Sequence, residues 1–541
     1  MVVEGVGVDE FVREDPMSLA GLLDDQARIR GDAIAIIDLD RTLTYEEAAK
    51  ERGQLSAALW SSGVGLGDRV GVHCNKGAAG LIAMHAIVSA GAVAVPLDPA
   101  SPPARLASIC NRMGIEVVIT HAPLVRSILA IHEQRPFQTV IGAVIDDATT
   151  KPLISVGPDQ VSQLAPMSPV NMDANEPAYI ITTSGSTGEP KGIVHTHSSA
   201  VAYAEMAVRT YGLDRADRVT DIAPLHFDIS TMALWAVPLV GAANVVVSEA
   251  HQRLPASHSQ LLADHGVTVW YSVPFLLQQL VTRGDLDNRD LTAMRWVHFG
   301  GEVITPETIS EMMRHCPNAQ FANIFGPAET NQCTLAVFDS PPPADRSVSI
   351  GFPLTNTEVR IAYLDADSPT DTSLVGPHEQ GEMWTHSPQL MVGYFDRPEV
   401  NARVLREVEG KRFYRSGDLV SHDEHGELTF HGRVDHQVKV RGFRVELEGI
   451  ELELEKLGAA EHVIVGVLRA HSNQDELIAG VLNTSADFDE SAFLRSAASV
   501  LPSYAVPSKI VTLDAPEFTG SGKLDRRALR ERSVAACERT L

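Results

Sequence analysis

The sequence predicts an α/β protein, with a large N-terminal region of layered α/β subdomains and a small α+β region at the C-terminus. Between about residues 33 and 250, short β-branched runs alternate with helical stretches, for example Arg69–Val72, Ala78–Ala90 and Ala92–Leu97. This alternation is typical of mostly parallel sheets covered by helices. The chain has 541 residues, which is too long for one hydrophobic core, so we expect two or more domains.

The strand pattern continues through Thr268–Val273 and Arg295–Phe299, and each run ends in Gly, Pro or a polar residue. Ligands of open α/β sheets bind at the carboxyl ends of strands, so these ends are candidate site positions. Beyond about Gly351 the sequence changes to short strands separated by turns, at Glu358–Ile361, Glu382–Thr385 and Glu427–Phe430. A smaller mixed region begins near His436 and contains an amphipathic helix from Glu448 to Leu457.

Composition excludes several classes of function. The formal net charge is -26, which argues against nucleic acid or an anionic membrane as a partner. The N-terminus lacks a signal-peptide pattern, and no apolar run is long enough to span a bilayer. The five cysteines are far apart and show no zinc spacing, which predicts free thiols and a cytoplasmic location; they are Cys74, Cys110, Cys316, Cys333 and Cys537.

The segment Thr182–Gly192 combines hydroxyls, glycines and one lysine. Glycines let backbone N–H groups converge on phosphate oxygens, and hydroxyls add donors. The segment follows an apolar run at Ala178–Ile181 and precedes a helical stretch from Ser198, so we expect a strand, a phosphate loop and a helix. A P-loop is excluded because Lys191 follows Pro190 rather than the second glycine. By composition alone, a flexible surface loop remains the alternative.

This loop resembles the phosphate loop of the adenylate-forming superfamily, which includes acyl-CoA synthetases, luciferases and the adenylation domains of nonribosomal peptide synthetases. The chain carries the family's ordered set of motifs over roughly residues 43 to 526. The resemblance implies ATP and Mg²⁺ as cofactors. It also implies an adenylation core over residues 1–433 and a mobile lid domain over residues 434–541.

The resemblance assigns roles to several ATP-binding segments. Asn323–Thr330 is similar to the motif that closes over ATP, in which Phe325 would lie against adenine and Glu329 would be the magnesium ligand and a catalytic residue. Ala328 stands where Thr is usual. Tyr414–Asp418 looks like the ribose motif, although alone it could be a turn aspartate. The implied ATP-binding residues are Thr183, Ser184, Gly185, Ser186, Thr187, Lys191, Gly301, Glu302, Asn323, Phe325, Gly326, Thr330, Asp418 and Arg433.

Two C-terminal segments resemble the parts of the family that move and react. In Gly432–Glu446, Asp435 matches the hinge, Arg441 and Gly442 the path of the pantetheine thiol, and Lys439 a catalytic position. Thr519–Arg526 resembles the segment with the catalytic lysine, Lys523. A lysine is a compact cation that can neutralise a carboxylate attacking a phosphate. Without the resemblance these segments would be a charged hairpin and a solvated lysine.

Asp228 is the residue that discriminates between substrate classes. In amino-acid-activating relatives an aspartate at this place pairs with the substrate ammonium, and a buried ammonium needs such a partner. The alternative is that Asp228 caps a helix. By alignment to the family, the substrate site comprises Phe227, Asp228, Ile229, Met232, Ser272, His298, Gly300, Ile324, Asn331, Gln332 and Cys333.

Met232 stands near the place where many peptide-synthetase domains carry tryptophan, which leaves room for a non-standard amino acid. The chain looks similar to stand-alone enzymes that activate β-amino acids for macrolactam antibiotics. It also looks similar to stand-alone ligases for proline and D-alanine. The sequence does not decide between α- and β-amino acids.

No carrier-protein motif follows Lys523, so we expect the acceptor to be a separate acyl or peptidyl carrier protein. Four arginines near the C-terminus are candidates for docking it, although they could instead balance a helix C-terminus: Arg526, Arg527, Arg530 and Arg532. The predicted function is ATP-dependent adenylation of an amino acid and its transfer to the carrier's phosphopantetheine thiol in natural-product biosynthesis. An acyl-CoA synthetase for non-amino acids and a non-catalytic nucleotide-binding protein are the alternatives.

Overall fold

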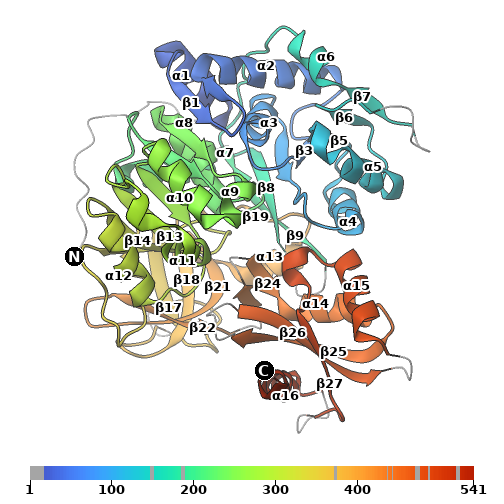
Figure 1. The fold of residues 1–541 in the computed structure, drawn as a ribbon, viewed down its shortest axis with the longest axis vertical. Coiled ribbons are helices and arrows are strands. Elements are labelled where there is room, and N and C mark those ends of the chain that lie inside the picture. Colours follow the sequence, from blue (N-terminus) through green and yellow to red (C-terminus); the bar gives the residue numbers. More distant parts are fainter. Residues whose placement is uncertain are drawn as a thin grey trace. The chain divides into compact units, whose positions relative to one another are not determined.

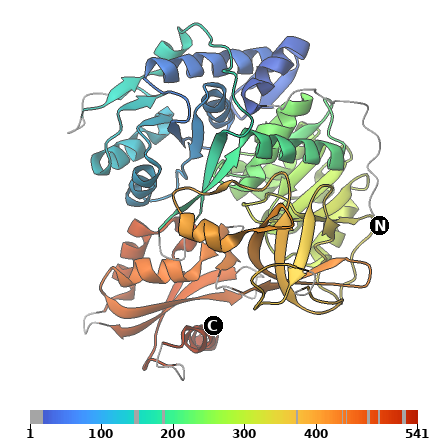
Figure 2. The ribbon, with the colours of Figure 1, turned by 180° about the vertical axis from the view of Figure 1, so that it is seen from behind.

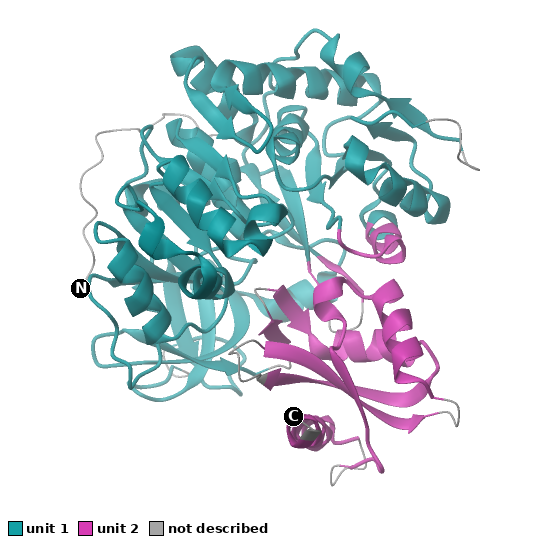
Figure 3. Cartoon of the chain, in the orientation of Figure 1, with its two compact units in different colours: residues 1–99, 110–182, 192–434 teal, residues 100–109, 183–191, 435–541 magenta. Residues whose placement is uncertain are grey.

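The computed structural model describes residues 18–145, 152–183, 189–370, 374–434, 437–440, 443–469, 475–484, 488–518 and 524–540 (Figure 1). Contacts divide the chain into two compact units (Figure 3). Unit 1 comprises residues 1–99, 110–182 and 192–434, and unit 2 comprises residues 100–109, 183–191 and 435–541. The predicted α/β class, with a large N-terminal and a smaller C-terminal domain, is confirmed. In the described ranges, no helix has the length and apolar character needed to cross a membrane.

The first sheet of unit 1 has nine strands in the order β16-β15-β14-β13-β12-β10-β11-β1-β2. Its central strands, from β14 to β1, are parallel, and β2, β15 and β16 pair antiparallel at the two edges. The strands are β1 (Ile34–Ile37), β2 (Thr42–Thr44), β10 (Arg218–Asp221), β11 (Ala243–Val246), β12 (Val269–Ser272), β13 (Trp296–Gly300), β14 (Gln320–Phe325), β15 (Thr334–Phe338) and β16 (Phe352–Pro353).

The second sheet has eight strands in the order β19-β9-β8-β4-β3-β5-β6-β7. β4 (Val93–Pro96) is buried along its whole length, as expected for a parallel strand covered on both faces. The other strands are β3 (Arg69–His73), β5 (Val117–Thr120), β6 (Thr139–Ile141), β7 (Ile154–Val156), β8 (Pro177–Thr183), β9 (Lys191–Thr196) and β19 (Gly393–Tyr394).

The third sheet is antiparallel and is drawn in yellow and orange (Figure 2). Its order is β17-β18-β21-β20, and β22 also pairs with β21. The strands are β17 (Glu358–Ala362), β18 (Gly381–His386), β20 (Leu405–Val408), β21 (Lys411–His422) and β22 (Leu428–Arg433). The change to short antiparallel strands beyond Gly351 therefore agrees with the sequence prediction.

Helices of unit 1 have clear start signals in the sequence. Thr44 and Glu47 form a capping box at the start of α2, and the Thr196 hydroxyl accepts from Ser199 N at the start of α7. Gly212 ends α7 in the left-handed region. The helices are α1 (Leu22–Arg30), α2 (Tyr45–Ser61), α3 (Ala78–Ser89), α5 (Val125–Gln134), α6 (Pro158–Ser162), α7 (His197–Tyr211), α8 (Val237–Val240), α9 (Glu249–Arg253), α10 (Pro255–Asp264), α11 (Pro274–Arg283), α12 (Pro306–His315) and α13 (Pro398–Val404). Helix α4 (Pro103–Met113) belongs to unit 2 up to residue 109 and to unit 1 beyond it.

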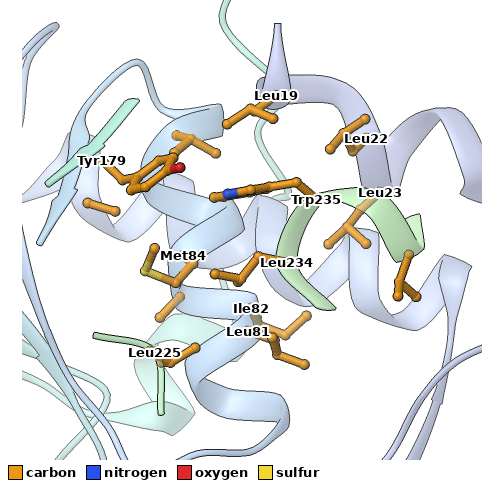
Figure 4. Close-up of a cluster of buried hydrophobic side chains, with 14 of the residues drawn as sticks. Leu19, Leu22, Leu23, Leu81, Ile82, Met84, Tyr179, Leu225, Leu234 and Trp235 are labelled. Atoms are coloured by element: carbon orange, nitrogen blue, oxygen red, sulfur yellow. The ribbon is translucent and has the colours of Figure 1, made fainter. Parts of the chain in front are cut away.

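The largest core cluster joins the N-terminal helices to the segment that follows β10. Trp235 is fully buried in a π-helical turn, η4 (Met232–Ala236), and packs near Tyr179 of β8 (Figure 4). Leucines and neighbouring apolar side chains surround this pair: Leu19, Leu22, Leu23, Leu81, Ile82, Met84, Leu225 and Leu234. The core thus reaches the turn that carries Asp228, which starts the short helix η3 (Asp228–Ser230).

Unit 2 has its own core. A two-stranded hairpin, β23 (Gln437–Val440) and β24 (Phe443–Glu446), precedes α14 (Leu447–Glu455). A three-stranded sheet and two helices complete the unit: β25 (Ala460–Arg469), β26 (Asp475–Thr484), β27 (Lys509–Thr512), α15 (Glu490–Val500) and α16 (Arg526–Thr540). The helix predicted from Glu448 to Leu457 coincides with α14.

One strand was not predicted. The helical stretch expected from Ser198 coincides with α7, but strand β9 (Lys191–Thr196), which the sequence pattern did not indicate, lies between the glycine-rich loop and this helix. β9 pairs with β8 on one side and with β19 on the other, and all of its residues after Lys191 are buried. Residues Ile193 and Val194 satisfy their backbone in the sheet, so the loop does not end at a helix N-terminus.

Candidate active site

Three parallel strands of the first sheet bring predicted substrate residues together. Register pairs Tyr271 of β12 with His298 of β13, and Gly300 with Ile324 of β14. A Cβ atom on Gly300 would lie 2.3 Å from the Ile324 carbonyl oxygen, so only glycine fits at this position. Ser272, His298 and Ile324 therefore lie at neighbouring carboxyl ends of the sheet, where ligands of α/β proteins bind.

Gln332 is the centre of a buried hydrogen-bond network. Its Nε2 donates to the hydroxyls of Tyr203 (3.1 Å) and Tyr271 (3.4 Å), and its Oε1 accepts from the Tyr211 hydroxyl (2.5 Å). All four side chains are buried, and burial raises the pKa of each tyrosine above its usual value. A satisfied polar network of this kind is rigid, because breaking any bond leaves a buried group unpaired.

His298 lies beside this network. Its ring is 4.1 Å from the Tyr211 ring and 5.1 Å from the Trp296 ring, measured between centroids. Burial lowers the pKa of His298 to about 3, so the imidazole is neutral at physiological pH. Neither ring nitrogen has a hydrogen-bond partner in the described ranges, and the side chain is 0% exposed.

Asp228 is half-buried at the start of η3, and it does not cap this helix. The N-cap is Phe227, without a side-chain cap bond, and the Asp228 carboxylate instead accepts from the Ile229 amide (3.0 Å). Burial raises the pKa values of Tyr179, Tyr203 and Tyr271, and the negative charge of Asp228 adds to each increase. The Asp228 carboxylate thus interacts electrostatically with three buried tyrosines.

The loop after β14 ties this acid to the strand ends. Asn331 accepts from the Thr231 hydroxyl (3.2 Å), and Thr231 also donates to the Asp228 carbonyl. Asn331 has φ +55°, in the left-handed region that Asn tolerates better than most residues. A Cβ atom on Gly326 would lie 2.0 Å from the Asn331 carbonyl, so the tight turn between them requires glycine. Asp228, Asn331 and Gln332 are therefore held by one connected set of contacts.

The candidate nucleotide residues of unit 1 lie in the same loop and in the third sheet. Glu329 is 0% exposed, and its Oε1 accepts from the Tyr394 hydroxyl (2.6 Å). Asp418 of β21 is cross-strand from Arg433 of β22, and the Arg433 Nη1 donates to the Asp418 Oδ1 (2.5 Å). Cys333 is near both acids, since the charges of Asp418 and Glu329 contribute to its raised pKa.

Other predicted nucleotide residues border this group. Phe325 ends β14, is half-buried, and has its ring 5.5 Å from the Phe430 ring. Asn323 donates to the Ser349 carbonyl (2.8 Å), and the Thr330 hydroxyl lies 2.9 Å from the Cys333 sulfur. Glu302, beside Gly301 with φ +96°, accepts from the Phe275 amide (3.3 Å). The half-buried Phe325 presents an aromatic face at a strand end, which suits a purine ring.

The remaining predicted residues divide between described and undescribed parts of the chain. Thr183 ends β8, and Lys191 starts β9 with its Nζ 3.6 Å from the Glu446 Oε1, both within unit 2. Lys439 is exposed on β23, where it pairs with Arg444 of β24. The residues that lie outside the described ranges are Ser184, Gly185, Ser186, Thr187, Asp435, Arg441, Gly442 and Lys523.

The four C-terminal arginines are engaged within unit 2. Arg526 and Arg530 bind the two carboxylate oxygens of Glu451, which is 0% exposed. Arg532 pairs with Glu517 (2.7 Å) and Arg527 with Glu531 (3.2 Å). Arg526 and Arg530 are therefore engaged by the buried Glu451, so Arg527 and Arg532 are the better candidates for docking a carrier protein.

The described ranges contain no preformed cluster of metal-binding side chains. No group of three or more His, Cys, Asp or Glu side chains there could hold a metal ion. All five cysteines are buried and form no disulfide, as predicted. A magnesium ion that is bound mainly by nucleotide phosphates and water needs one or two protein carboxylates, so a single acid such as Glu329 fits this role.

Comparison with known proteins decides the family. A family model described as AMP-binding enzyme matches residues 23–395, more than half of the chain. The chain belongs to the AMP-binding enzyme family. As a member, it is an ATP-dependent, adenylate-forming ligase. The resemblance to the adenylate-forming superfamily that the motifs indicated is confirmed.

The relatives include peptide-synthetase proteins. Phenyloxazoline synthase MbtB of Mycobacterium sp. (strain MCS) is 32% identical over 504 residues, which cover 92% of this chain and 40% of MbtB. A linear gramicidin synthase protein of Brevibacillus parabrevis is 31% identical over 506 residues, which cover 92% of this chain and 6% of that protein. The chain therefore spans less than half the length of these curated relatives. This family enzyme adenylates a carboxylic or amino acid.

Solved structures show the same fold. The amide bond synthetase McbA from Marinactinospora thermotolerans has a TM-score of 0.82 at 21% identity, over 95% of this chain and 99% of that one. The Vibrio cholerae adenylation domain AlmE, in complex with glycyl-adenosine-5'-phosphate, has a TM-score of 0.81 at 23% identity, over 98% of this chain and 100% of that one.

Sequence reasoning missed four tyrosines of the site. Tyr203, Tyr211 and Tyr271 bind Gln332 across separations of 61 to 129 residues, and Tyr394 binds Glu329 across 65 residues. A buried tyrosine on an apolar helix or strand gives the same sequence signal as any other core residue. The Gly393–Tyr394 dipeptide carries no turn or cap pattern that would have distinguished it.

Proposed function

We propose that this ligase activates a small amino acid as its adenylate and then transfers the acyl group to the phosphopantetheine thiol of a separate carrier protein. The single observation that carries the amino-acid assignment is Asp228, a half-buried acid whose charge acts on the buried Tyr179, Tyr203 and Tyr271 and which does not cap its helix. A substrate ammonium that leaves water needs a partner charge, and the Asp228 carboxylate would supply one.

The packing of the strand ends favours a small side chain on the substrate. Five predicted substrate residues are each at most 3% exposed to solvent, which leaves little room beside them: Met232, Ser272, His298, Ile324 and Gln332. A side chain that displaced Gln332 would break its bonds to the three tyrosines, and each break would cost about 1–3 kcal/mol. The glycyl adenylate held by AlmE is a small aminoacyl group of the kind we propose.

A second group of residues supports the binding of ATP and magnesium. Asp418 would accept from the ribose hydroxyls, Phe325 would pack against adenine, and Glu329 would bind the magnesium ion. When bound, the ion supplies positive charge that neutralises the phosphates. Lys523, which lies outside the described ranges, would place a further cation beside the reacting groups.

The proposed reaction has two steps. A carboxylate oxygen of the amino acid attacks the α-phosphorus of ATP, the bond to the β-phosphate oxygen breaks, and pyrophosphate leaves. The carrier thiol then loses its proton and attacks the carbonyl carbon of the adenylate, and AMP leaves. Carrier transfer is supported by the resemblance of Gly432–Glu446 to the family segment along the path of the pantetheine thiol. The β position for the amine is favoured by the resemblance to enzymes that activate β-amino acids for macrolactam antibiotics.

A substrate panel tests the proposal. Pyrophosphate exchange is measured with glycine, β-alanine, alanine, 3-aminobutyrate, phenylalanine and the matched acids without the amine. We expect exchange with small amino acids, and at least about tenfold less with phenylalanine and with acetate or propanoate. Exchange with fatty or aryl acids and none with amino acids would contradict the amino-acid assignment and favour an acyl-CoA synthetase. ATP binding without exchange for any acid would favour a non-catalytic protein.

The acceptor is tested separately. The purified enzyme, ATP and the activated amino acid are incubated with a phosphopantetheinylated carrier protein or with free CoA. We expect the carrier to gain the mass of the aminoacyl group. Faster thioester formation on free CoA would contradict the carrier assignment and leave the adenylation step intact.

A further inference from the structure

A buried hydroxyl connects the candidate magnesium ligand to the strand after the phosphate loop. Tyr394 is 5% exposed, and its hydroxyl donates to the Glu329 Oε1 at 2.6 Å. The same short segment also binds the backbone of Glu329, because the Met391 amide donates to the Glu329 carbonyl (2.8 Å). Both the backbone and the carboxylate of Glu329 are therefore held by residues 391–394.

This segment is equally bound to β9. β19 pairs antiparallel with β9, with Gly393 opposite Val194 and Tyr394 opposite Ile193. Two further backbone bonds flank the pair, from the Val392 amide to Val194 (2.9 Å) and from the Phe395 amide to Gly192 (2.7 Å). Any displacement of β9 is therefore transmitted to the tyrosine that holds Glu329.

The backbone of Tyr394 is itself clamped. Asn401 of α13 accepts from the Tyr394 amide (2.7 Å) and donates to the Tyr394 carbonyl (2.9 Å). The ring packs in a buried cluster with Ile193, Met391 and Tyr414. With its backbone bound on both sides and its ring packed, Tyr394 presents its hydroxyl in one position, which is the condition for orienting another side chain.

A second hydroxyl extends the connection to the candidate ribose strand. The Tyr414 hydroxyl lies 3.4 Å from the Tyr394 hydroxyl. Tyr414 belongs to β21, the strand that also carries Asp418. The strand after the phosphate loop, Glu329 and the strand of the candidate ribose acid thus meet at Tyr394.

We propose that Tyr394 is a positioning residue that orients the Glu329 carboxylate for the magnesium ion of bound ATP. The inference rests on the proposed function, in which Glu329 binds that ion. A hydroxyl donor leaves the carboxylate charged while fixing its direction, whereas an arginine or lysine partner would neutralise the charge that the ion requires. Loss of the hydroxyl removes this donor, while the bond from the Met391 amide still holds the backbone of Glu329.

The test compares Tyr394→Phe with Tyr414→Phe, which removes the neighbouring hydroxyl. ATP binding is measured by calorimetry at increasing Mg²⁺, and AMP binding is measured without a divalent ion. We expect Tyr394→Phe to raise the half-saturating Mg²⁺ concentration about tenfold and to leave the AMP affinity within about twofold. Tyr414→Phe should raise it less than about threefold, because its contact with Tyr394 is longer. Equal weakening of AMP and Mg-ATP by Tyr394→Phe would indicate a purely structural role and overturn the proposal.

A double-mutant cycle sharpens the test. In a Glu329→Gln background, Tyr394→Phe should not change the Mg²⁺ dependence further, because the two residues act on the ion as one unit. A full additional loss in that background would overturn the proposal. If Tyr394→Phe fails to fold, Asn401→Ala, which releases the backbone clamp, is expected to raise the Mg²⁺ requirement in the same direction. Native protein that binds ATP with no Mg²⁺ dependence would instead contradict the role of Glu329 in the proposed function.

Discussion

Units 1 and 2 differ in where they carry the residues that we assign to function. In unit 1 these residues lie on strands or in the loop after β14, and His298, Glu329, Gln332 and Asp418 are all buried. In unit 2, Lys439 is exposed on a two-stranded hairpin. Two ionic groups of unit 2 are mostly buried: Glu451 with Arg526 and Arg530, and Lys191 with Glu446. The buried polar groups of unit 1 are thus candidates for recognition, whereas the Glu451 group stabilises the fold of unit 2.

The comparison shows that buried polar side chains serve two purposes in this chain, ligand recognition and stabilisation of the fold. A buried polar side chain at the carboxyl end of a parallel strand is placed where ligands bind, and its contacts fix a shape. A buried ion pair between two helices fixes their packing and touches no ligand site. Groups that react in two successive steps of catalysis are better placed on loops, because a loop can move without disrupting the core. The predictions below test this contrast, from the largest expected effect to the smallest.

Lys523→Ala should have the largest effect on catalysis and none on recognition. We expect pyrophosphate exchange to fall about 10²–10³-fold, because a positioned cation stabilises the charge that develops at phosphorus. Amino-acid binding, which we assign to unit 1, should change less than about twofold. Transfer from a chemically supplied adenylate to the carrier should be largely spared. Equal loss of both steps would contradict the division of labour.

Glu451→Gln should destabilise unit 2 and spare unit 1. The substitution leaves two guanidinium groups without their buried carboxylate, which costs about 2–3 kcal/mol when the cations are partly exposed. All five tryptophans (Trp60, Trp235, Trp270, Trp296 and Trp384) belong to unit 1. Limited proteolysis between residues 443 and 540 should therefore accelerate while the tryptophan fluorescence transition in urea stays in place. Arg527→Gln is the matched control, since its exposed pair contributes less than about 0.5 kcal/mol.

Asp228→Asn should separate amino acids from plain acids. Removing the charge that we assign to the ammonium should lower kcat/KM for the best amino acid about 10–100-fold, since Asp228 is only half-buried. Activity with the matched acid that lacks the amine should be unchanged or higher. Thr231→Val, which removes a bond to the Asp228 carbonyl without changing charge, is the control. The same loss for both substrates would show that Asp228 is structural.

Acid should destabilise unit 1. Burial lowers the pKa values of His85, His258 and His298 to about 3 and of His73, His195 and His197 to about 4. Below the unfolded pKa of about 6.5 the unfolded state binds more protons, so the free energy of unfolding falls as pH falls, by about 1.4 kcal/mol per histidine at pH 5.5. Asp221, whose burial raises its pKa to about 7, has the opposite sign and offsets part of this loss.

Tryptophan fluorescence in urea at pH 7.5 and 5.5 measures this effect in unit 1. In the described part of unit 2 the histidine is His462, which is half-exposed, so resistance of residues 443–540 to proteolysis should change little. His298→Phe should flatten the pH dependence of the fluorescence transition by about one histidine's contribution. A transition midpoint that does not move between the two pH values would contradict the assignment of neutral buried histidines.

Sequence pattern alone predicted the fold class and several strands, among them β12 and β13. The grouping of Ser272, His298, Gly300 and Ile324 came from the resemblance to the family. The pattern could predict strands because apolar runs with polar ends identify strands and their ligand-facing termini. It could not predict β9, because the six residues between the glycine-rich loop and α7 gave no turn signal that separated them from the helix. It could not predict the tyrosines that bind Gln332 and Glu329 either, because those contacts join residues far apart in sequence.

The central claim is that Asp228 binds the amine of the substrate. A crystal structure of the protein with a non-hydrolysable aminoacyl-adenylate analogue of the best substrate in the panel tests it most directly. We predict that the substrate nitrogen lies within about 3.2 Å of an Asp228 carboxylate oxygen. A structure in which the bound amine meets another residue, while the Asp228 carboxylate turns to solvent, would contradict the account.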